Sequence, residues 1–118
     1  MSIKPSDFLD FAESVLINNN EISNRNAVSR SYYSLYHSVC SELKHCPPTS
    51  HSGVISYLRS RNENKGEDLD QATMLKLAAL LEQTKKQRVV ADYDLEHNID
   101  ETDAKSTIIL VKKGLSLF

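Results

Sequence analysis

The scarcity of chain-breaking residues constrains this sequence most, because its 118 residues include only three glycines and three prolines. These residues lie at the edges of long stretches in which apolar residues recur at the spacing of one helical face. No stretch alternates apolar and polar residues for long enough to form a sheet, and no internal repeat is present. The sequence therefore predicts an all-α fold, an up-and-down bundle of four main helices with one additional short helix.

Capping residues and apolar stripes indicate where the first two helices lie. The first helix should begin at Pro5, whose fixed φ suits a first helical turn, and end at the asparagines 18–20. Its expected buried stripe consists of Phe8, Phe11, Ala12, Val15 and Leu16. Ser23 or Asn24 can cap a long second helix, which the prolines 47–48 end. Its expected apolar positions are Val28, Leu35, Val39 and Leu43.

Three further helices are expected in the second half of the chain. Thr49 or Ser50 can cap a short one, and the polar stretch 62–66 then reads as a turn. The next helix should run from about Asp68 towards Tyr93. Asp100 begins the last helix, with Ile99 before it placed to pack against Ala104 as a hydrophobic staple. The expected buried residues are Val54, Ile55, Leu58, Met74, Leu77, Ala78, Leu81, Ala104, Ile108, Leu110, Val111 and Leu115.

Size and composition favour one domain over residues 1–118. Hydrophobic residues make up 40% of the chain and charged residues 25%, the balance of an ordinary soluble globular protein. No apolar run approaches the ~20 residues that cross a bilayer, and the first ten residues lack the pattern of a signal peptide. We therefore expect a cytoplasmic protein with no membrane partner.

The charge is unevenly distributed although the net charge is only −2. Residues 89–104 carry six acidic side chains and no lysine or arginine, so the remaining segments together are net basic. The basic side chains can form a local nucleic-acid-binding surface or can be scattered on solvated helix faces. Those considered for such a surface are Arg25, Arg30, Arg59, Arg61, Lys85, Lys86 and Arg88.

The two cysteines, Cys40 and Cys46, are expected to be free thiols in a reducing compartment. Together with His37, His45 and His51 they could be drawn as a zinc cluster. Their spacing matches no common zinc finger, and the prolines 47–48 interrupt the run. We therefore expect neither a metal nor a cofactor.

Arg30 and His37 are the residues that suggest chemistry. Seven positions on a helix rise about 10 Å and return to within roughly 20° of the same direction, so one group could meet both side chains. Histidine transfers protons near neutral pH, and the planar guanidinium suits a phosphoryl group. The structural alternative is a core histidine bonded to a carbonyl and a surface arginine in an ion pair.

Aromatic and acidic residues near this pair have structural readings as well. Tyr32 and Tyr36 are expected to pack in the core, whereas Tyr33 can either pack or contact a base or phosphate. Arg88 and Asp92 are spaced i, i+4, as a helical ion pair requires. A bracing role for Arg88, Asp92 and the adjacent Tyr93 is favoured, and a carboxylate that orients an arginine could also prepare it to bind phosphate.

Three segments together resemble a known family. The segment 27–37, which contains Arg30 and His37, resembles the central helix of HEPN domains, small prokaryotic proteins often encoded beside a minimal nucleotidyltransferase. The segment 88–93 resembles the Arg-x3-Asp-Tyr turn of that family, and 51–55 also has the family's appearance. With the last helix included, the resemblance spans nearly the whole chain.

The resemblance implies a helical bundle that dimerises through its central helices and, in many members, a metal-independent endoribonuclease. The family signature is an arginine followed by a histidine after four to six residues, a spacing that Arg30 and His37 meet. Two positions depart from the pattern. Ser31 stands where active members often have Asn, Asp or His, and Val39 stands where members silenced by adenylylation have Tyr. The adenylylation mechanism is therefore not carried over.

The function expected first is an RNA-cleaving toxin or defence nuclease, a homodimer that leaves a 2′,3′-cyclic phosphate. Arg30 and His37 are its expected catalytic residues, and Ser31, Tyr33, Arg88, Asp92 and Tyr93 are candidates to bind substrate or support the site. The alternative is a non-catalytic module that binds a nucleotidyltransferase partner, such as an antitoxin, or a nucleotide. A third reading is a helical adaptor whose Arg30 and His37 only hold a dimer together.

Overall fold

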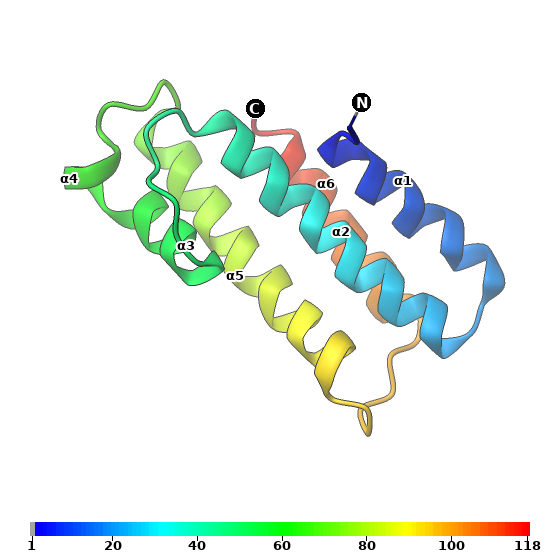
Figure 1. Cartoon of the computed structure of the whole chain (residues 1–118). Coiled ribbons are helices and arrows are strands. Elements are labelled where there is room, and N and C mark those ends of the chain that lie inside the picture. The colour runs from blue at the N-terminus through cyan, green and yellow to red at the C-terminus, as the bar shows by residue number, and fades with distance from the viewer. Residues whose placement is uncertain (1) are drawn as a thin grey trace.

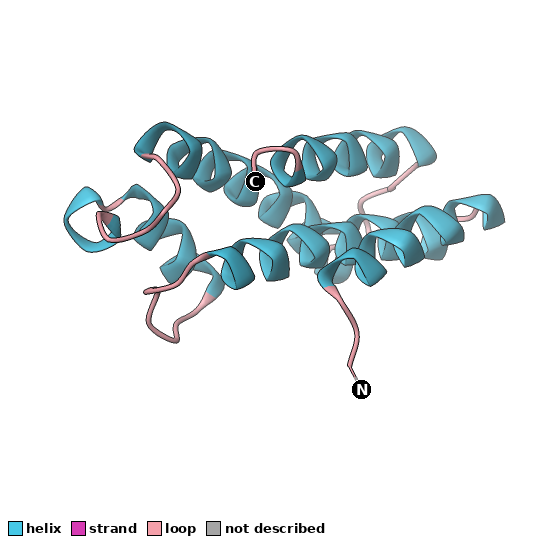
Figure 2. Ribbon diagram, turned by 90° about the horizontal axis from the view of Figure 1, so that it is seen from above, coloured by secondary structure: helices cyan, strands magenta, loops and turns pink. Residues whose placement is uncertain are grey.

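The computed structural model describes residues 2–118, and within this range it contains helices and no strand, so the predicted all-α class is confirmed (Figures 1 and 2). Five α-helices of nine or more residues are joined by shorter elements. In chain order the elements are α1 (Pro5–Val15), the 3-10 turn η1 (Leu16–Asn18), α2 (Glu21–Glu42), α3 (His51–Arg59), α4 (Arg61–Asn64), α5 (Gln71–Tyr93) and α6 (Glu101–Leu115).

Side-chain caps set most helix starts, as the sequence predicted. Ser50 Oγ accepts from Gly53 N at 3.0 Å, and Asp100 Oδ1 accepts from Asp103 N at 2.8 Å. The predicted cap of α2 is wrong. Asn20, with its side chain accepting from Ser23 N at 3.0 Å, begins this helix. The asparagine run therefore ends one helix and also starts the next, because Asn19 adopts the left-handed conformation that reverses the chain.

Two other local predictions are wrong. Residues 61–64 form the one-turn helix α4 where a turn was expected. Asn64 is fully buried there, and its amide donates to the carbonyls of Tyr57 and Leu58 in the last turn of α3. Phe11, which was expected to be buried, is 47% exposed, and Ala12 is the buried residue of α1.

Helix α2 lies at the centre of the packing and contacts α1, α5 and α6, while α3 packs on α5 (Figure 1). The main core contains Tyr32, Leu35 and Val39 of α2 with residues of α3, α5 and α6. A smaller cluster joins Ala27 and Val28 to Ile99 and Ala104, the pair predicted as a staple. These contacts are compatible with the up-and-down order of the four main helices, which stays a prediction.

Close approach fixes α6 on α2 at Gly114. A Cβ built at Gly114 would lie 2.7 Å from Cδ1 of the fully buried Leu35, so any side chain there would force either Leu35 or the two helices to move. One face of α2 is therefore committed to the core. None of the helices that the structure describes is sufficiently long and apolar to span a bilayer.

Candidate functional site

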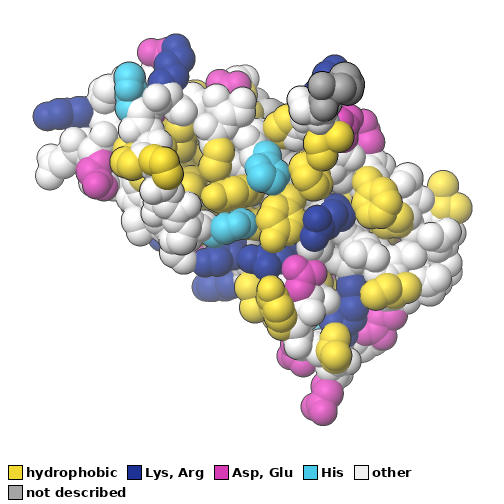
Figure 3. All heavy atoms as spheres, in the orientation of Figure 1, with side chains coloured by type: hydrophobic (Ala, Val, Ile, Leu, Met, Phe, Trp, Pro, Cys, Tyr) yellow, Lys and Arg dark blue, Asp and Glu magenta, His cyan; other side chains and the backbone are white. Residues whose placement is uncertain are grey.

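The candidate site lies along the side of α2 that its neighbouring helices cover only in part. Tyr33 and Tyr36 are half-buried on this face, and His37 is exposed. The start of α3 adds His51, and α5 adds Arg88. Figure 3 shows two histidine side chains on this face among hydrophobic side chains, with lysine or arginine side chains next to them. We call the group Phe8, Tyr32, Tyr33, Tyr36, His37 and His51 the aromatic cluster.

Ring contacts connect the members of the aromatic cluster. The ring of His37 contacts two other rings, with its centroid 5.2 Å from that of Phe8 and 5.9 Å from that of Tyr33. His51 lies parallel to Tyr36 at 3.9 Å, with 5° between the planes, and edge-on to Tyr33 at 5.9 Å. The two histidines therefore contact the same two tyrosines, Tyr33 and Tyr36, although 14 positions separate the histidines in sequence.

Two arginines lie over the aromatic cluster. The Cζ atom of Arg30 is 4.7 Å from the centre of the Tyr33 ring, and that of Arg88 is 5.5 Å from both Tyr32 and Tyr33. Cation–π attraction of this kind holds a guanidinium over a ring without using its N–H donors. Arg30 and His37 thus contact one ring, Tyr33, which places both predicted catalytic side chains beside a common surface.

A polar chain connects the two arginines. Nη2 of Arg30 donates to Ser29 Oγ at 3.1 Å, and Ser29 Oγ donates to Asp92 Oδ2 at 3.2 Å. The same oxygen of Asp92 is 3.5 Å from Nη1 of Arg88, the i, i+4 pair that the sequence predicted. Asp92 therefore orients Arg88 directly and Arg30 through Ser29. The role of Ser29 could not be predicted from the sequence, because a buried serine has no distinguishing pattern.

Arg88 keeps donors that no protein group satisfies. Its side chain is only 11% exposed, and its Nε is buried without a hydrogen-bond partner among residues 2–118. Buried donors are nearly always paired in native proteins, so the enclosed Nε of Arg88 is an unsatisfied polar group of this fold. A phosphate oxygen is the acceptor that a guanidinium binds best.

Burial keeps the neighbouring phenols and thiol protonated. It raises the pKa of Tyr36 to about 12 and raises the pKa of Tyr32 well above its usual value. Burial also raises the pKa of Cys40, which is a free thiol as predicted. These groups therefore stay protonated near neutral pH and can act as hydrogen-bond donors. Among residues 2–118 no group of three or more His, Cys, Asp or Glu side chains is arranged to hold a metal ion.

His51 is the second residue that sequence reasoning did not identify as part of a site. Its Nδ1 is 2.6 Å from the Tyr32 hydroxyl. Desolvation, followed by the positive charges of Arg88 and Lys85, lowers its pKa. The predicted Ser50 cap correctly places His51 at the start of a helix, but nothing in the sequence indicates that this helix packs against Tyr32.

Two predicted site residues lie away from this surface. Ser31 is fully buried, and its hydroxyl donates back to the Val28 carbonyl at 3.0 Å, so it cannot reach a ligand on the open face. Tyr93 is 72% exposed at the end of α5 and takes no part in the ring contacts described above. The structure therefore brings together Arg30, Tyr33, His37, Arg88 and Asp92.

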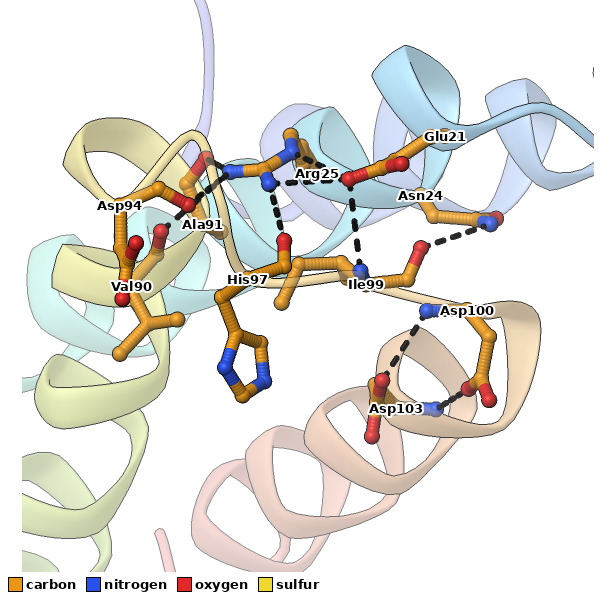
Figure 4. A network of polar contacts seen from close by, with 10 residues as sticks. All are labelled: Glu21, Asn24, Arg25, Val90, Ala91, Asp94, His97, Ile99, Asp100 and Asp103. Atoms are coloured by element: carbon orange, nitrogen blue, oxygen red, sulfur yellow. Dashed lines mark hydrogen bonds and ion pairs between the residues drawn. The ribbon is translucent and has the colours of Figure 1, made fainter.

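Arg25 is not part of a basic surface, contrary to one of the two readings of the charge pattern. It is 7% exposed and pairs with Glu21 at 2.9 Å. Its Nη1 and Nη2 donate to main-chain carbonyls at and beyond the end of α5, which belong to Val90, Ala91, Asp94 and His97 (Figure 4). The acidic segment 89–104 thus wraps its backbone around this arginine.

A groove between α3 and α5 adjoins the site. It has a volume of about 560 Å³, a largely apolar floor that includes Ile55 and Val89, and the basic residues Arg59, Lys85 and Lys86. Arg59 is paired with Glu82 at 3.0 Å, and Lys85 donates to Ser52, the neighbour of His51, at 2.6 Å. Positive charge therefore continues from the aromatic cluster into the groove.

Comparison of the chain with family models, with curated proteins and with solved structures gave no match to any of them.

Proposed function

We propose that this protein is a metal-independent endoribonuclease of the toxin or defence type that acts in the cytoplasm as a homodimer. The observation that carries the proposal is the shared ring of Tyr33, which Arg30 and His37 both contact, with Arg88 on the same ring. The open side of this group offers two guanidiniums, an exposed imidazole and aromatic surface. Single-stranded RNA presents the matching phosphates and bases.

The chemistry needs only the groups that are present. His37 accepts the proton of a ribose 2′-hydroxyl, whose oxygen attacks the adjacent phosphorus. The bond from phosphorus to the 5′-oxygen breaks, and a second protonated group, the partner's His37 in this proposal, gives that oxygen a proton. Arg30 and Arg88 stabilise the charge that develops on the phosphorane. The products carry a 2′,3′-cyclic phosphate and a 5′-hydroxyl.

The dimer in this proposal uses the open face of α2, the central helix of an up-and-down bundle. Phe8, Tyr33, Tyr36 and Cys40 are only half-buried in the single chain, and they pack beside the exposed His37. A two-fold axis across this face would cover the apolar rings and bring two Arg30–His37 pairs together. Each composite site would then hold one proton acceptor and one proton donor.

Cleavage by purified protein tests the proposal. We expect His37→Ala and Arg30→Ala each to lower cleavage of host RNA by roughly 10²–10⁴-fold, while the folded dimer and the wild-type activity in EDTA persist. The exposed residues His45 and Arg61 provide matched controls, and His45→Ala and Arg61→Ala should cleave normally. Wild type that cuts no RNA, or His37→Ala protein that cuts equally well, would contradict the proposal.

A second candidate function is a non-catalytic module that binds a nucleotide or a nucleotidyltransferase-type antitoxin. Two observations favour it. Ser31, at the position that is often Asn, Asp or His in active members of the family that the sequence resembles, is buried. The groove beside the site is large enough, at about 560 Å³, for a ligand with an apolar ring and a charged tail. Nucleotide binding without any RNA cleavage would favour this alternative.

A further inference from the structure

His51 has the surroundings of a residue held in one chemical state. It is the first residue of α3, it is half-buried, and its ring lies flat on Tyr36 at 3.9 Å. Its Nδ1 atom is 2.6 Å from the hydroxyl of Tyr32, a residue with no exposed surface. Stacking fixes the plane of the imidazole, and the hydrogen bond fixes its rotation within that plane.

The direction of this hydrogen bond follows from what the Tyr32 hydroxyl can reach. A buried hydroxyl needs an acceptor for its proton, and Nδ1 of His51 is the partner found for it. If Nδ1 carried a proton, it would have to donate to the phenol oxygen, and the phenol proton would lose its acceptor. The neutral imidazole with its proton on Nε2 is therefore the form that this geometry stabilises.

The charged neighbours of His51 disfavour its protonation further. Tyr32, Tyr36 and His37 approach it from α2, and Arg88 and Lys85 approach it from α5. Arg88 and Lys85 are cationic, and none of the five carries a carboxylate that could pair with an imidazolium. Desolvation together with these charges lowers the pKa of His51, in agreement with the hydrogen-bond geometry.

We propose that His51 is a further substrate-binding residue of this site, a neutral hydrogen-bond donor whose Nε2–H binds a phosphate oxygen of single-stranded RNA. A neutral imidazole can serve enzymes as a donor to a developing negative charge, and it remains a donor across the physiological pH range. Arg88 lies against the same Tyr32 ring as His51, and its positive charge favours a phosphate beside both residues. The choice of ligand rests on the proposed function, whereas the protonation state does not.

The protonation state is tested without RNA. Two-bond proton–nitrogen correlation spectra of the ¹⁵N-labelled protein should show His51 neutral with its proton on Nε2 at pH 7. Tyr32→Phe removes the hydroxyl but keeps the ring, so His51 should then populate both tautomers and become protonated at higher pH. A wild-type spectrum with the proton on Nδ1, or with an imidazolium at pH 7, overturns the proposal.

Ligand binding is tested with single-stranded RNA whose 2′-hydroxyls are methylated, so that cleavage cannot occur. His51→Ala should weaken its binding by about tenfold, whereas His51→Gln, whose side-chain amide can donate from near the Nε2 position, should stay within about threefold of wild type. Equal binding by wild type and His51→Ala overturns the proposal. If His51 behaves as expected but the wild type cleaves no unmodified RNA, the proposed nuclease function fails and the binding role of His51 is retained.

Discussion

Arg25 and Arg30 lie five residues apart on the same helix, and their environments differ completely. Arg25 is 7% exposed and donates to carbonyls of Val90, Ala91, Asp94 and His97 as well as to Glu21 (Figure 4). Arg30 is half-exposed, lies on the Tyr33 ring and donates to one hydroxyl, that of Ser29. Arg25 uses its donors to join α2 to the end of α5, whereas Arg30 has N–H groups that remain available to a ligand.

The difference shows what decides the role of an arginine. A chain that leaves a helix exposes carbonyls with no helical partner, and a guanidinium with several donors can satisfy a group of them at once. Where the neighbours are rings, a guanidinium is held by its face and its N–H groups stay free. The partners, rather than the residue type or the helix, therefore separate a structural arginine from one available for binding.

Replacement of each arginine by alanine should show the largest difference between Arg25 and Arg30. Arg25→Ala removes the donor from one buried and three partly buried carbonyls and leaves Glu21 with the distant Ile99 amide, so we expect it to lower the free energy of unfolding by about 3–5 kcal/mol. Arg30→Ala loses a partly exposed cation–π contact and should cost about 1 kcal/mol or less. Urea unfolding followed by circular dichroism measures both, and equal losses would contradict the distinction.

The positions of the helices could largely be predicted from the sequence, because caps and chain breakers act locally. Pro5, Ser50 and Asp100 begin or cap helices as expected. The role of Arg25 could not be predicted. Its carbonyl partners lie 65 to 72 positions away, and a backbone carbonyl carries no side-chain signal.

Spacing within one helix indicated part of the candidate site. The seven-residue interval placed Arg30 and His37 on one face, and the four-residue interval paired Arg88 with Asp92. Contacts between helices were beyond such reasoning. Ser29 joins Arg30 to Asp92, and His51 meets Tyr32, only after α5 and α3 have packed on α2.

Tyr33 tests whether the open face is a dimer interface, as the proposed function requires. Tyr33→Asp would place a charge in the centre of the buried patch, so we expect the dimer dissociation constant to rise by roughly 30-fold or more. Tyr93→Asp is the matched control, because Tyr93 is 72% exposed and lies outside the aromatic cluster. Light scattering over a micromolar concentration series gives the answer, and a wild type that is monomeric throughout would refute the composite site.

Two acidic residues, Asp92 near Arg30 and Glu21 beside Arg25, allow a test with smaller expected effects. Asp92 accepts from Ser29 and Arg88, whereas Glu21 accepts from Arg25, so each carboxylate orients one region. Asp92→Asn keeps an acceptor but removes the charge, and we expect it to lower the rate of RNA cleavage by about tenfold with little loss of stability.

Glu21→Gln should do the reverse, lowering stability while cleavage per folded molecule stays at the wild-type level. Cleavage rates and urea midpoints of the two variants, measured side by side, distinguish the regions. Loss of cleavage in Glu21→Gln that matches the loss in Asp92→Asn would mean that the two arginine networks are coupled.

The smallest expected effect is a pH dependence of stability that originates at His51 of the aromatic cluster. Its pKa is lowered in the folded protein, so the unfolded chain binds the proton more readily, and the unfolded state is favoured as the pH falls below the ordinary histidine value of about 6.5. The contribution of His51 to stability should therefore be fully present above that pH and decline below it.

His51→Gln cannot take up this proton, so the stability advantage of the wild type over this variant should shrink between about pH 7.5 and pH 5. Urea unfolding at both pH values measures the differences, and an advantage over His51→Gln that grows as the pH falls would mean that the fold prefers the imidazolium.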